Sequence, residues 1–355
     1  MRTALALYRT LPLRVKGNST ANNGTPQLLD LWNTTFEMTM SRLRLALVVF
    51  LLWVLAALVY GQLVSTDSPQ KIIIDTDIGD DVDDAFAVAL ALRSPELQIL
   101  GISTVFGDTQ VRVQLLDRLL GEAGRQDIPV AKGTPTDAKT SLSQRRYAEG
   151  GRFRRATHPE AVPFILDQIR RHPGQITLIC IGPLVNVGAL VDQDPSTFRQ
   201  LQRVVLMGGS IERGYGDLGY SKPHGPDAEW NIKNDPHSAQ KLLASGVPVF
   251  MMPLDSTQLK LDETKRAILF QAGTPLSDAL TLLYHEWGQQ TPTLFDPMTI
   301  AFVVNPKLCP VKPLRIRVNE EGFTRPEQGA ANAQVCLDSD SEAFFRFYIR
   351  RIAGE

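Results

Sequence analysis

Six aspartates occupy ten consecutive positions in the segment DTDIGDDVDD, residues 75–84. Three branched apolar residues, Ile72 to Ile74, precede this segment, and the alanine-rich run AFAVALAL follows it. This pattern predicts a short buried strand that passes directly into a helix. Like charges a few ångströms apart repel and raise one another's pKa. The compensating charge can come from solvent, from the free N–H groups of a helix N-terminus or from a bound cation.

A hard divalent cation is the better account of this acidic run. One or two carboxylates would satisfy a helix N-terminus, and six exceed that need. Carboxylate oxygens are the ligands that Ca²⁺ and Mg²⁺ prefer. The run does not fit the EF-hand calcium loop, because its glycine comes one place early and Phe86 stands where the bidentate glutamate belongs.

A haloacid-dehalogenase phosphatase is a second interpretation of the same stretch. Asp75 would then be the nucleophile and Asp77 the general acid of a Mg²⁺-dependent reaction. Ile78 stands where that signature normally has Thr or Val. The later lysine and the downstream acidic pair of that class are not found in the sequence.

Elements of alternating type must position these carboxylates. From about residue 69, apolar runs of four to eight residues alternate with amphipathic helical segments. Strands are expected within 71–75, 97–107, 175–182, 203–209 and 247–254, and helices within 83–94, 109–124, 161–172, 198–202 and 235–246. This alternation predicts one α/β domain over residues 69–355, with an open, mostly parallel, doubly wound sheet and helices on both faces. An irregular insertion is expected at 134–158.

The aspartate run should lie at the ligand-binding edge of that sheet. In open α/β folds, ligands bind outside the carboxyl ends of the strands. Asp75 ends the first expected strand, and Asp83 and Asp84 open the first expected helix.

The composition is that of an ordinary globular enzyme-sized chain. The 355 residues are 43% hydrophobic and 21% charged, with a formal net charge of -1. No charge excess favours a nucleic-acid partner. Cys180 lies in an apolar run and is interpreted as core packing, whereas a Cys309–Cys336 disulfide remains open.

The first 66 residues read as a separate region. Residues 1–40 are polar and irregular, as in a poorly structured extension or a mis-assigned start. Within 41–66, Arg42 and Arg44 precede the apolar run 45–60, which is typical of a signal peptide. We therefore expect export to the periplasm or the medium. A membrane anchor through 45–60 is the alternative, and the only membrane association expected.

Six segments, in this order, resemble one enzyme family: DTDIGDDVDDA, STVFGDT, IGPLVN, VLMGG, AEWNIKNDP and TLFDPMTIAF. Together they are similar to the inosine–uridine-preferring nucleoside N-ribohydrolases, from about residue 70 onward. The resemblance implies an N-glycosyl hydrolase that converts a ribonucleoside to free base and ribose. It also implies a Ca²⁺ cofactor, a small-molecule nucleoside as substrate and a homo-oligomer.

The resemblance assigns roles residue by residue. The metal ligands would be Asp77, Asp84, the main-chain carbonyl of Ile181, and Asp296, with Asp77 also taking the proton from the attacking water. The run is two residues longer than the family's shorter form, so Asp80 or Asp81 could instead replace Asp83 or Asp84. The substrate contacts would be Asp83, Asp108, Met207, Glu229, Trp230 and Asn231. Asp108 stands where the best-known members carry Asn.

Leaving-group activation is the point at which this chain departs from the resemblance. Many members have His immediately before the late metal-binding Asp, and here that position is Phe295. Phe295 would stack on a base or pack in the core. His224 or His158, both expected in loops, could supply a proton instead. Asn186 is interpreted as a strand-to-helix cap. A non-catalytic ribose- or nucleoside-binding protein of the same fold remains a further alternative.

Overall fold

The computed structural model describes residues 68–149, 151–218, 222 and 224–354, together with Leu47, Phe50, Leu51 and Trp53. The chain divides into two units, 1–67 and 68–355. In the first unit, the four described positions are helical and exposed. The expected extension 1–40 and most of the expected signal or anchor lie outside the described residues. Within the described ranges, no helix combines the length and apolar character needed to span a bilayer.

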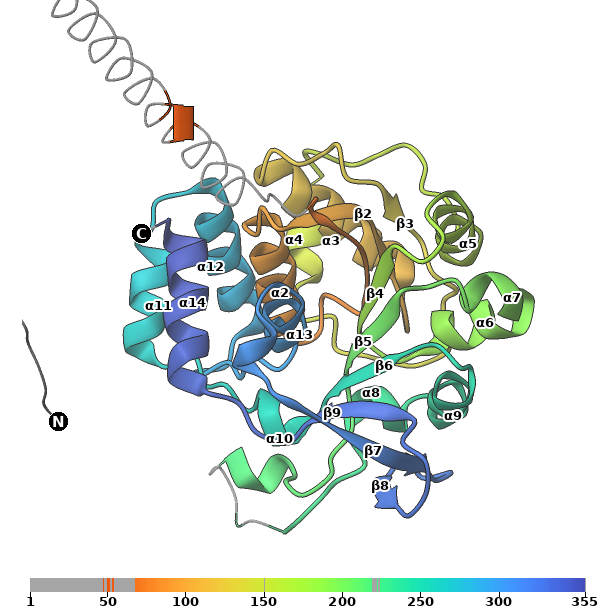
Figure 1. Cartoon of the computed structure of the whole chain (residues 1–355). Helices are drawn as coiled ribbons and strands as arrows, with labels where there is room; N and C mark the ends of the chain where they lie inside the picture. Colours follow the sequence, from red (N-terminus) through yellow and green to blue (C-terminus); the bar gives the residue numbers. More distant parts are fainter. Residues whose placement is uncertain are drawn as a thin grey trace, which may run out of the picture. The chain divides into compact units, whose positions relative to one another are not determined.

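A nine-stranded sheet forms the centre of the second unit (Figure 1). Its strand order is β3-β2-β1-β4-β5-β6-β9-β7-β8, and every pairing from β3 to β9 is parallel. The antiparallel strands β7 and β8 complete one edge. The predicted open, mostly parallel sheet is therefore confirmed. The strands are β1 (Gln70–Thr76), β2 (Leu97–Thr104), β3 (Val130–Ala131), β4 (Ile176–Ile181), β5 (Arg203–Met207), β6 (Val249–Met252), β7 (Val311–Val318), β8 (Thr324–Glu327) and β9 (Ala333–Cys336).

Helices cover both faces of the sheet, as predicted. Figure 1 shows α11, α12 and α14 on one side and α5, α6, α7 and α9 on the other. The α-helices are α2 (Asp83–Leu92), α3 (Thr109–Glu122), α4 (Arg145–Glu149), α5 (Ala161–Arg171), α6 (Val185–Gln193), α7 (Pro195–Phe198), α8 (Trp230–Lys233), α9 (Pro236–Ala244), α10 (Leu254–Thr257), α11 (Glu263–Phe270), α12 (Pro275–Trp287), α13 (Pro297–Val304) and α14 (Ser341–Ala353). Two 3₁₀ turns, η1 (Tyr215–Leu218) and η2 (Pro306–Leu308), complete the set.

Strand β1 is buried on both faces, which explains its unbroken apolar run. Ile72 and Ile74 belong to the core beneath α2, α12 and α14, whereas Ile73 belongs to the core beneath α5, α6 and α9. All three side chains are fully buried. A parallel strand with helices on both faces requires this composition. The two carboxylates that open α2 are consequently carried into the interior with the helix.

The turn between β1 and α2 depends on a glycine. Gly79 has φ +123°, a region that other residues rarely adopt. The expected insertion 134–158 packs against this turn and contains the short helix α4. Leu142 N–H donates to Asp80 Oδ1 at 2.6 Å, and the Gln144 amide donates to the Asp81 carbonyl at 2.6 Å. The insertion thereby holds the aspartate run from outside.

The three cysteines form one disulfide and leave one free thiol. Cys309 and Cys336 form a disulfide with a Cα–Cα distance of 5.7 Å, and Cys180 is free and buried in the core. The disulfide ties the turn after α13 to the end of β9.

Removing the disulfide should weaken the fold without rearranging it. A link across a sequence separation of 27 restricts the unfolded chain, and the chain-entropy model gives about 3 to 4 kcal/mol for a loop of this length. We expect the Cys309→Ala/Cys336→Ala variant to lose about that much free energy of unfolding in urea titrations. Reductant should lower the stability of the wild type similarly and leave the double variant unchanged. An effect of reductant on the double variant would contradict this account.

Candidate active site

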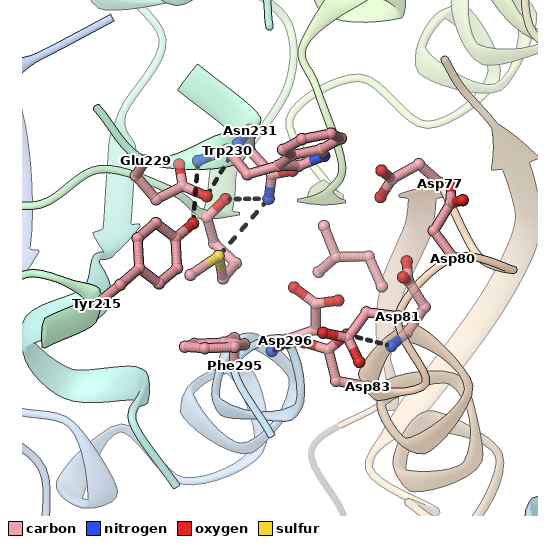
Figure 2. Close-up of a pocket in the computed structure, with 13 residues that line it drawn as sticks. Asp77, Asp80, Asp81, Asp83, Tyr215, Glu229, Trp230, Asn231, Phe295 and Asp296 are labelled. Carbon is pink, nitrogen blue, oxygen red and sulfur yellow. Dashed lines mark hydrogen bonds between the residues drawn. The ribbon is translucent and has the colours of Figure 1, made fainter. Parts of the chain in front are cut away.

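The carboxyl ends of the central strands open into a cavity of about 260 Å³ (Figure 2). All of the predicted site residues line this cavity except Asp108. Three of its lining residues, Tyr215, Trp230 and Phe295, carry aromatic rings. The lining residues are Asp77, Asp80, Asp81, Asp83, Asp84, Ile181, Met207, Tyr215, Glu229, Trp230, Asn231, Phe295 and Asp296.

Three carboxylates form a compact cluster at one end of the cavity. Oxygens of Asp83, Asp84 and Asp296 lie within 4.8 Å of one another, and all three residues are buried. Burial, together with repulsion between neighbouring carboxylates, raises the pKa of each well above its usual value. No lysine, arginine or histidine is among the cavity-lining residues. This donor set fits a hard divalent cation.

Asp77 lies in the same cavity but outside this cluster. Figure 2 shows Asp83 beside Asp296 and Asp77 apart from both. Burial raises the pKa of Asp77 to about 6, against the opposing effect of the Arg112 charge. The Asp77 carboxylate lies close to the end of β4 because the residue after Ile181 is a glycine. A Cβ at Gly182 would lie 2.7 Å from Asp77 Oδ1. The predicted metal ligands Asp77, Asp84, Ile181 and Asp296 therefore share one cavity, with Asp83 as an additional carboxylate.

Local contacts hold the carboxylates at the start of α2. The Thr76 hydroxyl donates to Asp84 Oδ1, and the same hydroxyl oxygen accepts from Ile78 N–H at 3.0 Å. The Asp296 main-chain N–H donates to Asp83 Oδ2 at 3.3 Å. The starts of α2 and α13 thus bring their carboxylates together, with Thr76 at the end of β1 as a hydrogen-bond donor.

The two additional aspartates of the long run differ in their surroundings. Both oxygens of Asp80 are engaged, because Oδ2 lies 2.6 Å from Arg112 Nη2 and Oδ1 accepts from Leu142 N–H. Asp81 Oδ1 accepts from Val82 N–H at 2.6 Å, and burial raises the pKa of Asp81 to about 6. Both carboxylate oxygens of Asp80 are therefore bound by protein donors, whereas only one carboxylate oxygen of Asp81 is bound in this way.

Asp75 lies behind the cavity and does not line it. It is 1% exposed, and its Oδ1 accepts from Ser103 Oγ at 2.5 Å and from Asn186 Nδ2 at 2.8 Å. Burial raises the pKa of Asp75 to about 7. The phosphatase interpretation requires this carboxylate to attack a substrate, and a carboxylate enclosed in this way cannot. Asn186 is structural, but the cap prediction is wrong: Leu184 is the N-cap of α6, and Asn186 joins Asp75 to the Thr104 carbonyl.

The start of α8 positions the predicted sugar-side residues. Glu229 is its N-cap and accepts from the N–H groups of Asn231, Ile232 and Gly209 at 2.8 to 3.1 Å. Burial raises the pKa of Glu229 to about 7 despite these three bonds. The Asn231 amide donates to the Met207 carbonyl at 3.1 Å. These contacts fix Glu229 and Asn231 beside the end of β5.

An aromatic wall faces the carboxylates. The Tyr215 and Phe295 rings meet edge to face with their centroids 6.2 Å apart. The Tyr215 hydroxyl oxygen accepts from the main-chain N–H of Trp230 at 3.1 Å. Trp230 is 47% exposed and meets Phe106 edge-on at 6.3 Å. No sequence pattern indicated Tyr215, because it lies in the short 3₁₀ turn η1 within a glycine-rich segment without periodicity. Phe295 is partly buried and lines the cavity, so it is not simply a core residue.

Three other candidates lie away from the cavity lining. Asp108 caps α3 by accepting from Val111 N–H at 3.2 Å, and it pairs with Arg145 at 3.3 Å. His158 Nε2 lies 3.0 Å from the buried Asp117, and His224 lies 3.7 Å from Asp227. Asp108 is thus positioned by its role as the cap of α3. Neither histidine lines the cavity, so neither is placed there to donate a proton.

Comparisons with known proteins agree with this geometry. Residues 72–346 match the family model described as inosine-uridine preferring nucleoside hydrolase. The chain is 32% identical to the pyrimidine-specific ribonucleoside hydrolase RihA of Citrobacter koseri, over 79% of this chain and 97% of that protein. It is 29% identical to uridine nucleosidase 1 of Arabidopsis thaliana, over 72% and 80% of the two chains. The solved purine-preferring ribonucleoside hydrolase from Gardnerella vaginalis superposes with a TM-score of 0.70 at 25% identity, covering 80% of this chain and 98% of that one.

Without divalent cations, the protein should lose stability as the pH rises from 5 to 8. The pKa of Asp75 and of Glu229, about 7 in the folded state, exceeds the value near 4 of an unfolded chain. Their stabilising contribution is full below about pH 4 and is lost as the pH rises through 7. At about 1.4 kcal/mol per pKa unit, we expect the free energy of unfolding in urea to fall by at least about 2 kcal/mol.

A divalent cation should restore stability at pH 8, since a ligand that binds only the folded state stabilises it. Asp296→Asn removes one member of the cluster and should abolish most of this gain. The control is Asp167→Asn, a half-exposed aspartate on α5 that pairs with Arg171 outside the cavity, which should retain the gain. Equal cation-dependent stabilisation in the two variants would contradict the assignment of the cluster.

Proposed function

The chain belongs to the inosine-uridine preferring nucleoside hydrolase family, and from this premise we propose that it hydrolyses the N-glycosidic bond of ribonucleosides to free base and ribose. The observation that supports this most directly is one cavity with a carboxylate end and an aromatic wall. A sugar that develops positive charge in the transition state is stabilised by neighbouring carboxylates. A flat base is bound by aromatic side chains.

The proposed cofactor is Ca²⁺, held by Asp77, Asp84, Asp296 and the Ile181 carbonyl, with Asp83 beside them. Oxygen donors from carboxylates and a main-chain carbonyl suit this ion, which accepts six to eight oxygens in flexible geometry. When bound, it would supply a lowered pKa for a water molecule and a fixed position for the sugar diol.

The side chains have separate tasks in this proposal. Asp77 accepts the proton of the attacking water as the general base; burial raises the pKa of its carboxyl, and a bound cation would lower it and keep the group ionised. Asp83 accepts a hydrogen bond from a ribose hydroxyl. Glu229 and Asn231 are fixed by main-chain contacts, so they bind the other sugar hydroxyls with little loss of side-chain entropy.

The relatives do not share one preferred base. Their names include a pyrimidine-specific enzyme, a uridine nucleosidase and a purine-preferring enzyme. Tyr215, Trp230 and Phe295 offer π-faces and edges that every nucleobase can contact. We therefore propose a ribonucleoside substrate, without specifying the base.

The wild type should release reducing sugar from at least one common ribonucleoside and no phosphate from p-nitrophenyl phosphate. Asp77→Asn should keep the fold and lower kcat by about 10² to 10⁴, the range for loss of a general base. Asp167→Asn should retain wild-type kcat. Tight nucleoside binding without turnover by the wild type would favour a binding protein, and near wild-type kcat in Asp77→Asn would refute the role of Asp77.

Expulsion of the base should depend on Tyr215 more than on a histidine. The Tyr215 hydroxyl oxygen accepts from the main-chain N–H of Trp230, so its own proton can form a hydrogen bond to the departing base, and burial keeps the hydroxyl protonated by raising its pKa. Tyr215→Phe should lower kcat/KM for inosine and uridine by about 10² or more. p-Nitrophenyl riboside, whose leaving group needs no proton, should be cleaved faster than either nucleoside and be little affected.

His224→Ala is the matched comparison, because His224 does not line the cavity. We expect wild-type kcat/KM from it with all three substrates. If His224→Ala slows nucleosides selectively and Tyr215→Phe does not, a closing loop supplies the proton and the role given to Tyr215 is wrong.

A further inference from the structure

Arg112 is unusual for a charged side chain. Among the lysines and arginines in the described ranges, it alone is fully buried, with 0% exposure. It lies in the first turn of α3 and does not line the cavity. A buried guanidinium is costly unless all of its donors are satisfied and its charge is paired. The positions of its partners therefore indicate what this residue holds in place.

Its partners are two loops at the binding edge of the sheet. Nη1 donates to the carbonyls of Asp77 and Ile78, the latter at 2.8 Å, and Nη2 donates to Asp80 Oδ2 at 2.6 Å. Nε donates to the Phe106 carbonyl at 2.8 Å. One planar group thus fixes the chain on both sides of Gly79 and joins it to the loop after β2.

The backbone is strained at both ends of this assembly. Phe106 and Leu142 are the non-glycine residues with positive φ in the described ranges, at 64° and 40°. Phe106 accepts from Arg112, and Leu142 donates to the Asp80 carboxylate that pairs with Arg112. Strained residues persist where surrounding contacts over-determine them, and they gather at functional sites.

The contacts also reach the aromatic wall. The Phe106 ring meets the Trp230 ring edge-on at 6.3 Å, and Trp230 lines the cavity. Arg112 therefore connects the main chain of Asp77 to the residue that supports Trp230, whose side chain in turn hydrogen-bonds Asp77. Two neighbouring parts of the cavity lining are thus held by one side chain that does not itself line the cavity.

We propose that Arg112 is a positioning residue for this site, which sets the main chain of Asp77 and, through Phe106, the location of Trp230. This role rests on the proposed function. The guanidinium is required as well as the charge, because its donors lie in a fixed plane and reach carbonyls of two loops. A lysine presents three donors on a single nitrogen and cannot span them.

The test compares Arg112 with Arg155, which provides a matched control. Arg155 also donates to two main-chain carbonyls, those of Ile128 and Gln126, and also pairs with a buried aspartate, Asp117, at 3.2 Å. It does not line the proposed catalytic cavity. Arg112→Lys and Arg155→Lys should therefore both lose stability, but only the first should affect the site.

Two readouts are taken at a temperature where each variant is folded. For Arg112→Lys, we expect Ca²⁺ affinity in calorimetric titrations to fall at least about tenfold. Its kcat/KM at saturating Ca²⁺ should fall by about 10², the loss that small misplacements cause. Arg155→Lys should match the wild type in both. In Arg112→Ala, methylguanidinium at millimolar concentration should restore part of both properties, since it can occupy the vacated space.

Failure of this proposal can be distinguished from failure of the proposed function. Wild-type Ca²⁺ affinity and kcat/KM in folded Arg112→Lys would overturn the proposal, as would equal losses in the two lysine variants. If Arg112→Ala does not fold, Arg112→Lys still decides. If the wild type hydrolyses no nucleoside, the proposed function fails, and Ca²⁺ affinity of the same variants continues to test Arg112.

Discussion

The dominant constraint on this structure is electrostatic: several carboxylates are buried at one edge of a parallel sheet. Asp77, Asp83, Asp84 and Asp296 are each at most 7% exposed. Desolvation and mutual repulsion both oppose their ionisation. The surrounding fold provides donors to some of these oxygens, such as the Thr76 hydroxyl for Asp84 and the Asp296 N–H for Asp83. What it does not supply is a cationic side chain inside the cavity, and this is the physical reason that a metal ion fits there.

The positive charge that the protein does supply lies behind the carboxylates. Arg112 opposes the rise in the pKa of Asp77 and of Asp84, yet its donors are used on main-chain carbonyls and Asp80. The cavity side of the acidic cluster therefore remains free for a cation and a polyol. A lysine or arginine placed within the cavity would neutralise the carboxylates equally well, but it would compete with the metal for the same oxygens.

Those parts of the fold and site that follow from local pattern could be predicted. The run Ile72, Ile73 and Ile74 predicts a strand buried on both faces, and the aspartates that follow it predict the position of the site. Long-range partners could not be predicted in the same way. Nothing in the sequence spacing indicates that Arg112 reaches back 34 residues to Ile78, or that Tyr215 enters the cavity. Asp108, predicted to contact the substrate, caps α3 and does not line the cavity; the sequence alone does not separate these roles, because both use a carboxylate just after a strand end.

The longer aspartate run shows how an added pair of residues can be accommodated without losing the site. Extra residues in a turn must be satisfied in their own hydrogen bonds, or they would compete for the ligand. Here the Asp80 carboxylate is bound by Arg112 and Leu142, and its carbonyl accepts from Ser143 Oγ at 2.7 Å. These donors come from α3 and from the insertion 134–158, two segments distant in sequence from the run. The run, the arginine and the insertion are thus joined by hydrogen bonds, and a change in the arginine or in the insertion reaches the site through the run.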